Sequence, residues 1–282
     1  MRKRLAVLGQ PVSHSRSPAM HRAALEEMGL LGEWSYQAIE VAPRDFEPLV
    51  REMAAGDFVG ANVTVPHKVA ALELADDATE GARAIGAVNT LSFRSGRIAA
   101  ENTDAQGFLD SLPGSPAGKR ALVLGAGGSA RAVAWALITQ GAQVSIWNRT
   151  PQKAEGLARE LGASALPSGD ERLERADFDL VVNTTTVGMG APGEGPAGLK
   201  SLPVRADSLG ERHELVDLAY GPAETELARA ARARGATVVD GLEVLVRQGA
   251  ASLRIWTGQD PPIETMRRAA RARCESSTTQ DT

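Results

Sequence analysis

The fold of half of this chain is predicted by the residues Leu122-Val123-Leu124-Gly125-Ala126-Gly127-Gly128-Ser129-Ala130. A short apolar strand runs into glycines and then into a helical pattern, the arrangement that lets a pyrophosphate rest on free backbone N–H groups. Glycine-rich turns also close ordinary strand-to-helix corners, so the context has to decide. Here a second strand, Val144-Ser145-Ile146-Trp147, follows in the order of a dinucleotide-binding unit. We therefore expect a dinucleotide cofactor.

The turn after this second strand predicts which dinucleotide binds. A carboxylate at this place normally accepts hydrogen bonds from the 2′-hydroxyl of NAD. Here the chain has Asn148-Arg149-Thr150, and Lys153 adds a second cation on the following helix. A guanidinium can fork two donors onto a phosphate and can stack on a purine. The sequence therefore predicts NADP(H) as the cofactor rather than NAD.

Composition limits the class of protein and of partner. A chain of 282 residues is long enough for about two domains. With 43% hydrophobic and 23% charged residues it has the profile of a globular protein. A net charge of −4 without a basic stripe argues against a nucleic-acid partner. No apolar run suits a membrane span or a signal peptide, so we expect a cytoplasmic protein that acts on a small molecule.

Metal binding is not expected from the cysteines and histidines. Cys274 is the only cysteine, and none of the four histidines forms a recognisable ligand spacing. We interpret His67 as structural and find no evident partner for His14, His21 or His213.

The order of the expected elements predicts an α/β fold with two α/β domains. In the first block, strands at 5–8, 34–41 and 58–63 alternate with helices at 18–28, 43–54 and 66–75, which indicates a mostly parallel sheet. A hairpin is expected at 91–93 and 98–99, and the second block has strands at 122–124, 144–147, 180–182, 215–218 and 237–239. A Pro/Gly-rich stretch at 113–118 predicts the boundary there or slightly before it. A last helix is expected at 242–256, a mobile loop at 192–203 and a disordered tail at 275–282.

Two segments after strands offer a proton donor for cofactor chemistry. The first, residues 62–68, ends in Lys68, which is expected in the first turn of a helix opened by Pro66, where the macrodipole disfavours a positive charge. An exposed surface lysine is the alternative. The second, residues 101–104, ends in Asp104, which could be catalytic or, like Thr103, could cap the helix that starts at Ala105.

A third segment, Ser13 to Pro18, presents hydroxyls ahead of a helix N-terminus. Such a loop suits a carboxylate, but a serine before a proline is also an ordinary helix start.

The chain resembles the shikimate dehydrogenase (shikimate/quinate dehydrogenase) family over almost its full length. The resemblance rests on eight segments in the family's order, namely residues 15–18, 60–68, 86–90, 102–104, 125–128, 148–153, 217–220 and 248–250. The chain departs from the family pattern at Ala100, where glycine is frequent, and at 241–245, which lacks a methionine often found beside the nicotinamide.

The resemblance implies a substrate and catalytic domain of residues 1–104 plus 242–274 and a Rossmann-like NADP-binding domain of residues 105–241. It implies Lys68 and Asp104 as the catalytic pair. It implies that Ser15 and Ser17 hold the substrate carboxylate with Thr64 and Tyr220 nearby, and that Asn62, Asn89, Asp104 and Gln248 bind the ring hydroxyls and the reacting oxygen. The implied cofactor residues are Gly125, Ala126, Gly127, Gly128, Ser129, Ala130, Asn148, Arg149, Thr150, Lys153, Leu218 and Gly241.

The implied activity is the reversible, NADPH-dependent reduction of 3-dehydroshikimate to shikimate, a step of chorismate and aromatic amino-acid biosynthesis. The two domains are expected to close on each other during hydride transfer, because that step needs close contact without water. One alternative is a quinate/shikimate dehydrogenase with a broader substrate or cofactor range. Another is a catalytically silent, NADPH-responsive regulator. The sequence does not decide the oligomeric state, for which a homodimer is one option.

Overall fold

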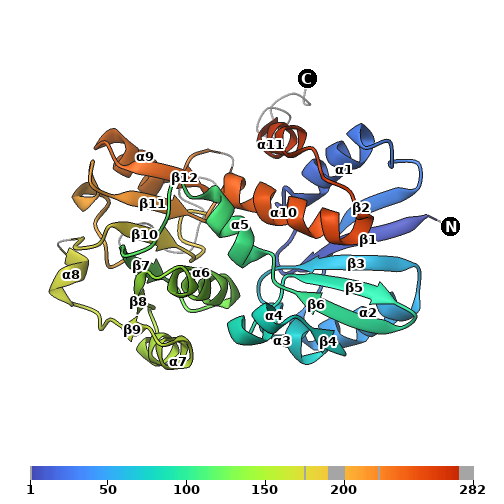
Figure 1. Cartoon of the computed structure of the whole chain (residues 1–282), viewed down its shortest axis with the longest axis horizontal. Coiled ribbons are helices and arrows are strands. Elements are labelled where there is room, and N and C mark those ends of the chain that lie inside the picture. Colours follow the sequence, from blue (N-terminus) through green and yellow to red (C-terminus); the bar gives the residue numbers. More distant parts are fainter. Residues whose placement is uncertain (1, 175, 190–200, 222, 273–282) are drawn as a thin grey trace, which may run out of the picture. The chain divides into compact units, whose positions relative to one another are not determined.

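The computed structural model describes residues 2–174, 176–189, 201–221 and 223–272 (Figure 1). Cys274, the expected tail at 275–282 and most of the expected loop at 192–203 lie outside the described residues. The chain forms two compact units: unit 1 comprises Met1–Gly107 and Leu245–Thr282, and unit 2 comprises Phe108–Val244. The expected α/β fold is confirmed in both units.

Unit 1 is built on a six-stranded sheet in the order β2-β1-β3-β5-β6-β4. Strand β1 pairs in parallel with β2 and β3, and β5 runs antiparallel to β3 and β6. The expected hairpin is therefore present. The strands are β1 (Lys3–Gly9), β2 (Trp34–Glu40), β3 (Phe58–Val63), β4 (Asp77–Ala78), β5 (Thr90–Arg94) and β6 (Arg97–Glu101).

Helices cover this sheet through apolar residues at helical spacing. Phe46, Val50 and Met53 of α2 are buried and share one core with the residues of β1 and β3. Helix α10 (Gly241–Thr257) packs on unit 1 through its C-terminal end, where Trp256 Nε1 donates to the Leu91 carbonyl at 3.1 Å. The helices are α1 (Ser17–Glu27), α2 (Pro43–Ala55), α3 (Lys68–Glu73), α4 (Glu80–Ile85) and α11 (Ile263–Ala272), and α5 (Asp104–Ser111) and α10 (Gly241–Thr257) each have residues in both units.

Unit 2 is a six-stranded parallel sheet in the order β12-β11-β10-β7-β8-β9. Counted from β7, this is the 3-2-1-4-5-6 order of dinucleotide-binding folds, and its direction of winding reverses between β7 and β10. The four inner strands β7, β8, β10 and β11 are mostly apolar and mostly buried, as is typical of parallel sheets. The strands are β7 (Arg120–Leu124), β8 (Gln143–Trp147), β9 (Ser164–Ala165), β10 (Leu180–Asn183), β11 (Glu214–Asp217) and β12 (Thr237–Asp240). The helices are α6 (Gly128–Thr139), α7 (Pro151–Leu161), α8 (Glu171–Glu174) and α9 (Glu226–Ala233), with a short 3-10 helix η2 (Ala206–Ser208).

The described residues offer neither a membrane span nor a metal cluster. No helix there has both the length and the apolar character needed to cross a bilayer. Nor do histidine, cysteine, aspartate and glutamate side chains gather in threes, within the described ranges, where they could hold a metal ion.

Candidate active site

Strand pairing in unit 1 brings two distant segments to one edge of the sheet. Asn62 lies opposite Thr90, and Thr90 lies opposite Glu101. Since β5 is antiparallel to both neighbours, the end of β3, the start of β5 and the end of β6 meet at this edge. The segments that leave β3 and β6 carry Lys68 and Asp104, so the topology places these two residues together although 36 positions separate them in sequence.

Lys68 and Asp104 form a nearly buried ion pair. The Lys68 Nζ donates to Asp104 Oδ2 at 2.6 Å, with 10% and 14% of the two side chains exposed. Each residue begins a short helix, α3 or α5. The expectation that Pro66 opens the lysine's helix is wrong, because Pro66 belongs to the turn before it and α3 begins at Lys68. The alternative of a solvated surface lysine is excluded by this burial.

The expected cap of α5 is also corrected. Asn102 Oδ1 accepts from the Ala105 N–H at 3.2 Å, so Asn102 takes the capping role that Thr103 or Asp104 had in one of the two alternatives. The Asp104 carboxylate is thereby left to bind Lys68 through one oxygen and Asn89 through the other.

Asn89 and Gln248 fix the orientation of this carboxylate. Asn89 Oδ1 accepts from the Thr103 N–H at 2.7 Å, so its Nδ2 faces Asp104 Oδ1 at 2.9 Å and Gln248 Oε1 at 3.0 Å. Gln248 Nε2 in turn donates to the Leu245 carbonyl at 2.8 Å, which directs Oε1 toward Asn89. The pair thus sits in a preorganised set of hydrogen bonds, as proton transfer requires.

Two residues that the sequence did not single out support Asn62. Its Oδ1 accepts from the Tyr36 hydroxyl at 2.7 Å, and its Nδ2 donates to Ser252 Oγ at 2.9 Å. Ser252 is fully buried and also bonds the hydroxyls of Thr90 and Thr103. Ser252 lies one helical turn after Gln248 on α10, so its spacing of four residues was the signal that could have found it.

The serine loop and Thr64 border β1. Ser17 is the buried first residue of α1, and its N–H donates to Ser15 Oγ at 3.2 Å. The Thr64 N–H donates to the Leu8 carbonyl at 2.8 Å, so this threonine lies at the end of β1. Tyr220 belongs to unit 2, whereas the other expected substrate residues all belong to unit 1.

In unit 2 the glycine turn follows β7, at the point where the sheet reverses its winding. Gly125 has φ +116°, and a Cβ there would lie 2.5 Å from Thr184 Oγ1, so both conformation and space require glycine. Gly127 precedes the first turn of α6, and nothing lies within 4 Å of a Cβ built on it. This open helix N-terminus fits a pyrophosphate.

The basic turn after β8 is exposed. Arg149, Thr150 and Lys153 are all exposed, and the Asn148 Nδ2 donates to the Thr150 carbonyl at 3.0 Å. Among the residues that the structure describes, neither Arg149 nor Lys153 has an ion-pair partner, so both can bind an anionic ligand.

Two other expected cofactor residues, Gly241 and Leu218, are in contact. A Cβ on Gly241 would lie 2.5 Å from the Leu218 carbonyl oxygen.

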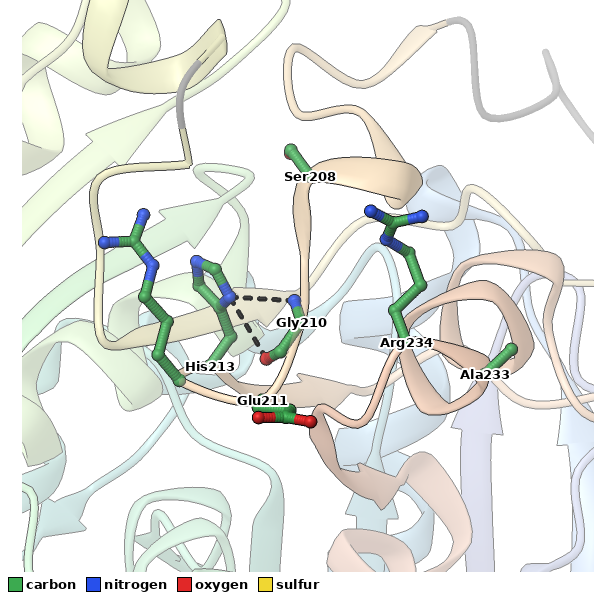
Figure 2. A pocket seen from close by; sticks show the side chains of 7 residues that line it. Ser208, Gly210, Glu211, His213, Ala233 and Arg234 are labelled. Atoms are coloured by element: carbon green, nitrogen blue, oxygen red, sulfur yellow. Dashed lines mark hydrogen bonds between the residues drawn. The ribbon is translucent and has the colours of Figure 1, made fainter.

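A separate pocket lies at the opposite edge of this sheet, before β11 and β12 (Figure 2). His213 lines it, but Nδ1 accepts from the Gly210 N–H at 2.9 Å and Nε2 lies 3.0 Å from the Ala176 carbonyl. Both ring nitrogens are therefore used within the fold. Ligands of parallel α/β sheets bind at the carboxyl ends of the strands, so this pocket is not the cofactor site.

The two histidines of unit 1 whose rings are buried are structural. His67 Nε2 lies 2.8 Å from the Val41 carbonyl and its ring stacks on Phe46, as expected. His21 and His213 do have partners, contrary to expectation. His21 Nδ1 lies 2.9 Å from the Ser17 carbonyl, its ring stacks on Tyr36, and burial lowers its pKa to about 4, so it is neutral.

Models of known families match three parts of the chain. The shikimate dehydrogenase substrate binding domain matches residues 7–91, the shikimate/quinate 5-dehydrogenase family matches residues 109–188, and the shikimate 5′-dehydrogenase C-terminal domain matches residues 241–271.

Individual relatives cover nearly the whole chain. The shikimate dehydrogenase (NADP⁺) of Methanopyrus kandleri is 44% identical over 278 residues, which are 94% of this chain and 93% of that protein. The crystal structure of shikimate 5-dehydrogenase from Thermus thermophilus with NADP(H) and shikimate is 43% identical, with a TM-score of 0.84 over 96% of this chain and 99% of that one. Quinate dehydrogenase from Corynebacterium glutamicum with NAD is 31% identical, with a TM-score of 0.82 over 95% of this chain and 98% of that one.

Proposed function

Because this chain belongs to the shikimate dehydrogenase family, we propose that it catalyses the reversible, NADPH-dependent reduction of 3-dehydroshikimate to shikimate, a step of chorismate and aromatic amino-acid biosynthesis. The buried Lys68–Asp104 ion pair carries this proposal. An ammonium beside a carboxylate at the carboxyl ends of strands is equipped to protonate a ketone oxygen.

In the proposed mechanism, Lys68 hydrogen-bonds the 3-keto oxygen and donates a proton as alkoxide charge develops there. Asp104 orients the ammonium through Oδ2, and Asn89 holds its other oxygen, as the 2.6 Å and 2.9 Å contacts indicate. Ser15 and Ser17 hold the substrate carboxylate with Thr64 and Tyr220 nearby. Asn62, Asn89, Asp104 and Gln248 bind the ring hydroxyls and the reacting oxygen.

Residues of unit 2 hold the cofactor in this proposal. NADPH supplies the hydride when bound. Its pyrophosphate rests on the turn Gly125–Ala130, Leu218 and Gly241 position the nicotinamide, and its 2′-phosphate is held by Asn148, Arg149, Thr150 and Lys153. The exposed cations Arg149 and Lys153 of the basic turn, which have no ion-pair partner in the described part of the chain, support this part.

A single absorbance assay tests the proposal. Purified protein is mixed with shikimate or quinate and with NADP⁺ or NAD⁺, and nicotinamide reduction is followed. We expect the highest kcat/KM for shikimate with NADP⁺. A preference for quinate or for NAD⁺ would support the second candidate, a dehydrogenase of broader range, which the similarity to a quinate dehydrogenase with NAD favours and Arg149 disfavours.

Absence of turnover with any of the four pairs, while NADPH still binds, would identify a silent NADPH-responsive regulator. The intact Lys68–Asp104 pair disfavours that outcome. A cytoplasmic location and a homodimer complete the proposal; light scattering of the purified protein measures the oligomeric state.

A further inference from the structure

The carboxyl edge of the unit 2 sheet holds a buried carboxylate that the proposed mechanism does not use. The last residues of four neighbouring strands are in register: Asn183 of β10 pairs with Leu124 of β7 and Asp217 of β11, and Asp217 pairs with Asp240 of β12. The residues immediately after them are Gly125, Thr184, Leu218 and Gly241. Three of these four are proposed cofactor residues, so Asp217 and Asn183 lie directly beneath the proposed cofactor edge.

Asp217 is 1% exposed, and its partners come from three segments. Oδ1 accepts from Asn183 Nδ2 at 2.8 Å and from the Ala219 N–H at 3.2 Å, and Oδ2 accepts from Thr225 Oγ1 at 2.5 Å. Thr225 caps α9 by accepting from the Ala228 N–H. A buried carboxylate needs such donors to offset its lost hydration. One side chain thus ties the ends of β10 and β11 to the start of α9.

Asn183 extends this network toward the glycine turn. Its Oδ1 accepts from the N–H and the hydroxyl of Thr185, and its carbonyl accepts from the Leu218 N–H at 2.9 Å. The next residue, Thr184, donates to the Leu124 carbonyl and lies where a Cβ on Gly125 would be. On the other side, Gly241 lies against the carbonyl oxygens of Leu218 and Asp217. Asp217 therefore borders every backbone segment proposed to place the nicotinamide.

We propose that Asp217 is a positioning residue for hydride transfer, which holds the backbone of Leu218–Tyr220 and the Asn183–Thr185 turn so that the nicotinamide end of the cofactor is placed productively. This inference rests on the proposed function. The placement of the nicotinamide end depends on Asp217, whereas the adenosine 2′-phosphate end, held by the basic turn after β8, does not. Misplacement of reacting groups by about 1 Å can cost on the order of 10²-fold in rate.

The test compares the full-length enzyme with Asp217→Asn, in which the side chain keeps its shape but loses the carboxylate. We measure kcat for shikimate with NADP⁺ and the Kd of adenosine 2′,5′-bisphosphate, which carries the 2′-phosphate but no nicotinamide. Asp217→Asn should lower kcat more than fivefold and leave the Kd of this fragment within twofold. A kcat within fivefold of wild type, or a fragment Kd raised by more than twofold, would overturn the inference.

Asp179→Asn is the matched control. Asp179 precedes β10 at the opposite edge of the same sheet, where it accepts two hydrogen bonds from the Arg120 side chain and one from its N–H. We expect a lower Tm but an unchanged kcat. An equal loss of kcat in both variants would mean that Asp217 only stabilises the sheet, and this would overturn the inference.

A second pair keeps the inference testable if Asp217→Asn does not fold. Thr225→Val removes the hydroxyl that binds Asp217, and Thr225→Ser retains it. Thr225→Val should lower kcat without changing the fragment Kd, and Thr225→Ser should match wild type; a wild-type kcat in Thr225→Val would overturn the inference. Failure of the proposed function is distinguishable, because wild type itself would then not oxidise shikimate.

Discussion

Among single residues, Lys68 of the Lys68–Asp104 ion pair should contribute to the rate of the reaction but not to the affinity for the cofactor. Lys68→Ala removes the proposed proton donor, and general acid catalysis typically contributes about 10²–10⁴-fold, so kcat should fall by that factor while the Kd of NADPH stays unchanged. Steady-state assays and fluorescence titration measure the two. The matched control is Lys119→Ala, which breaks a half-buried Lys119–Glu214 pair in unit 2 and should keep kcat. Near-normal turnover of Lys68→Ala would disprove the assigned role.

The guanidinium of Arg149 should increase the affinity for NADPH much more than the affinity for NADH. A hydrogen bond between charged partners is worth roughly 1.5–3 kcal/mol, so Arg149→Ala should weaken NADPH binding about 10- to 100-fold and NADH binding much less. Calorimetry with both cofactors measures the difference. Arg159→Ala, an exposed cation at the other end of α7, should change neither affinity. Equal losses for both cofactors in Arg149→Ala would remove the 2′-phosphate argument.

Asp217 should give the stability of the protein a pH dependence. Burial raises its pKa from 3.8 to about 6, so the folded state holds this proton more tightly than the unfolded state does. Its contribution is therefore favourable below pH 4 and is lost as the pH rises through 6, by about 3 kcal/mol in all. Urea unfolding of wild type and Asp217→Asn at pH 3 to 7 measures this. The difference in unfolding free energy between them should shift by that amount; a constant difference contradicts it.

Among the helices and strands, most of the periodic segments were predictable, whereas the two-residue strands and α4 were not. The expected strand at 58–63 has the bounds of β3, but β4 and β9 have two residues each and α4 has six, too few for a period to appear. Helix α11 was missed because only Met266 and Ala270 of its ten residues are buried. The contacts of Tyr36 and Ser252 with Asn62 were hidden for another reason. The four-residue spacing from Gln248 indicates that Ser252 lies on the same face of α10, but no local pattern connects it to Asn62, which is 190 positions away.

Helices α5 and α10 approach each other closely at Gly107, so a larger residue there should lower stability and weaken substrate binding. A Cβ on Gly107 would lie 2.6 Å from the Gln248 backbone nitrogen, so Gly107→Ala must push the two helices apart and shift Gln248. Overpacking typically costs 1–3 kcal/mol, so we expect about that loss in unfolding free energy and a raised KM for shikimate. Gly156→Ala, in α7 with nothing within 4 Å of the new Cβ, is the matched control and should be neutral or stabilising. An unchanged KM in Gly107→Ala would contradict the prediction.

The chain passes between its two compact units inside helices. It leaves unit 1 after Gly107 within α5 and returns after Val244 within α10. The Pro/Gly-rich stretch at 113–118 predicted a boundary nearby because such residues break regular elements. A helix that continues from one compact unit into the next carries no mark in composition, and for this reason the positions of both crossings could not be derived from the residues alone.

If the substrate binds to unit 1 and the cofactor to unit 2, the protein should become more compact when both are bound. If unit 1 holds the substrate and unit 2 holds the cofactor, hydride transfer requires the two bound molecules to meet at about 3–3.5 Å with water excluded. Shikimate and NADP⁺ together should therefore reduce the radius of gyration measured by small-angle scattering. Each ligand alone, and both ligands with Arg149→Ala at concentrations that saturate only wild type, serve as controls and should give less compaction. A scattering profile that both ligands leave unchanged would mean that the proposed hydride transfer needs no closure, because both ligands would then bind to units already at their reactive separation.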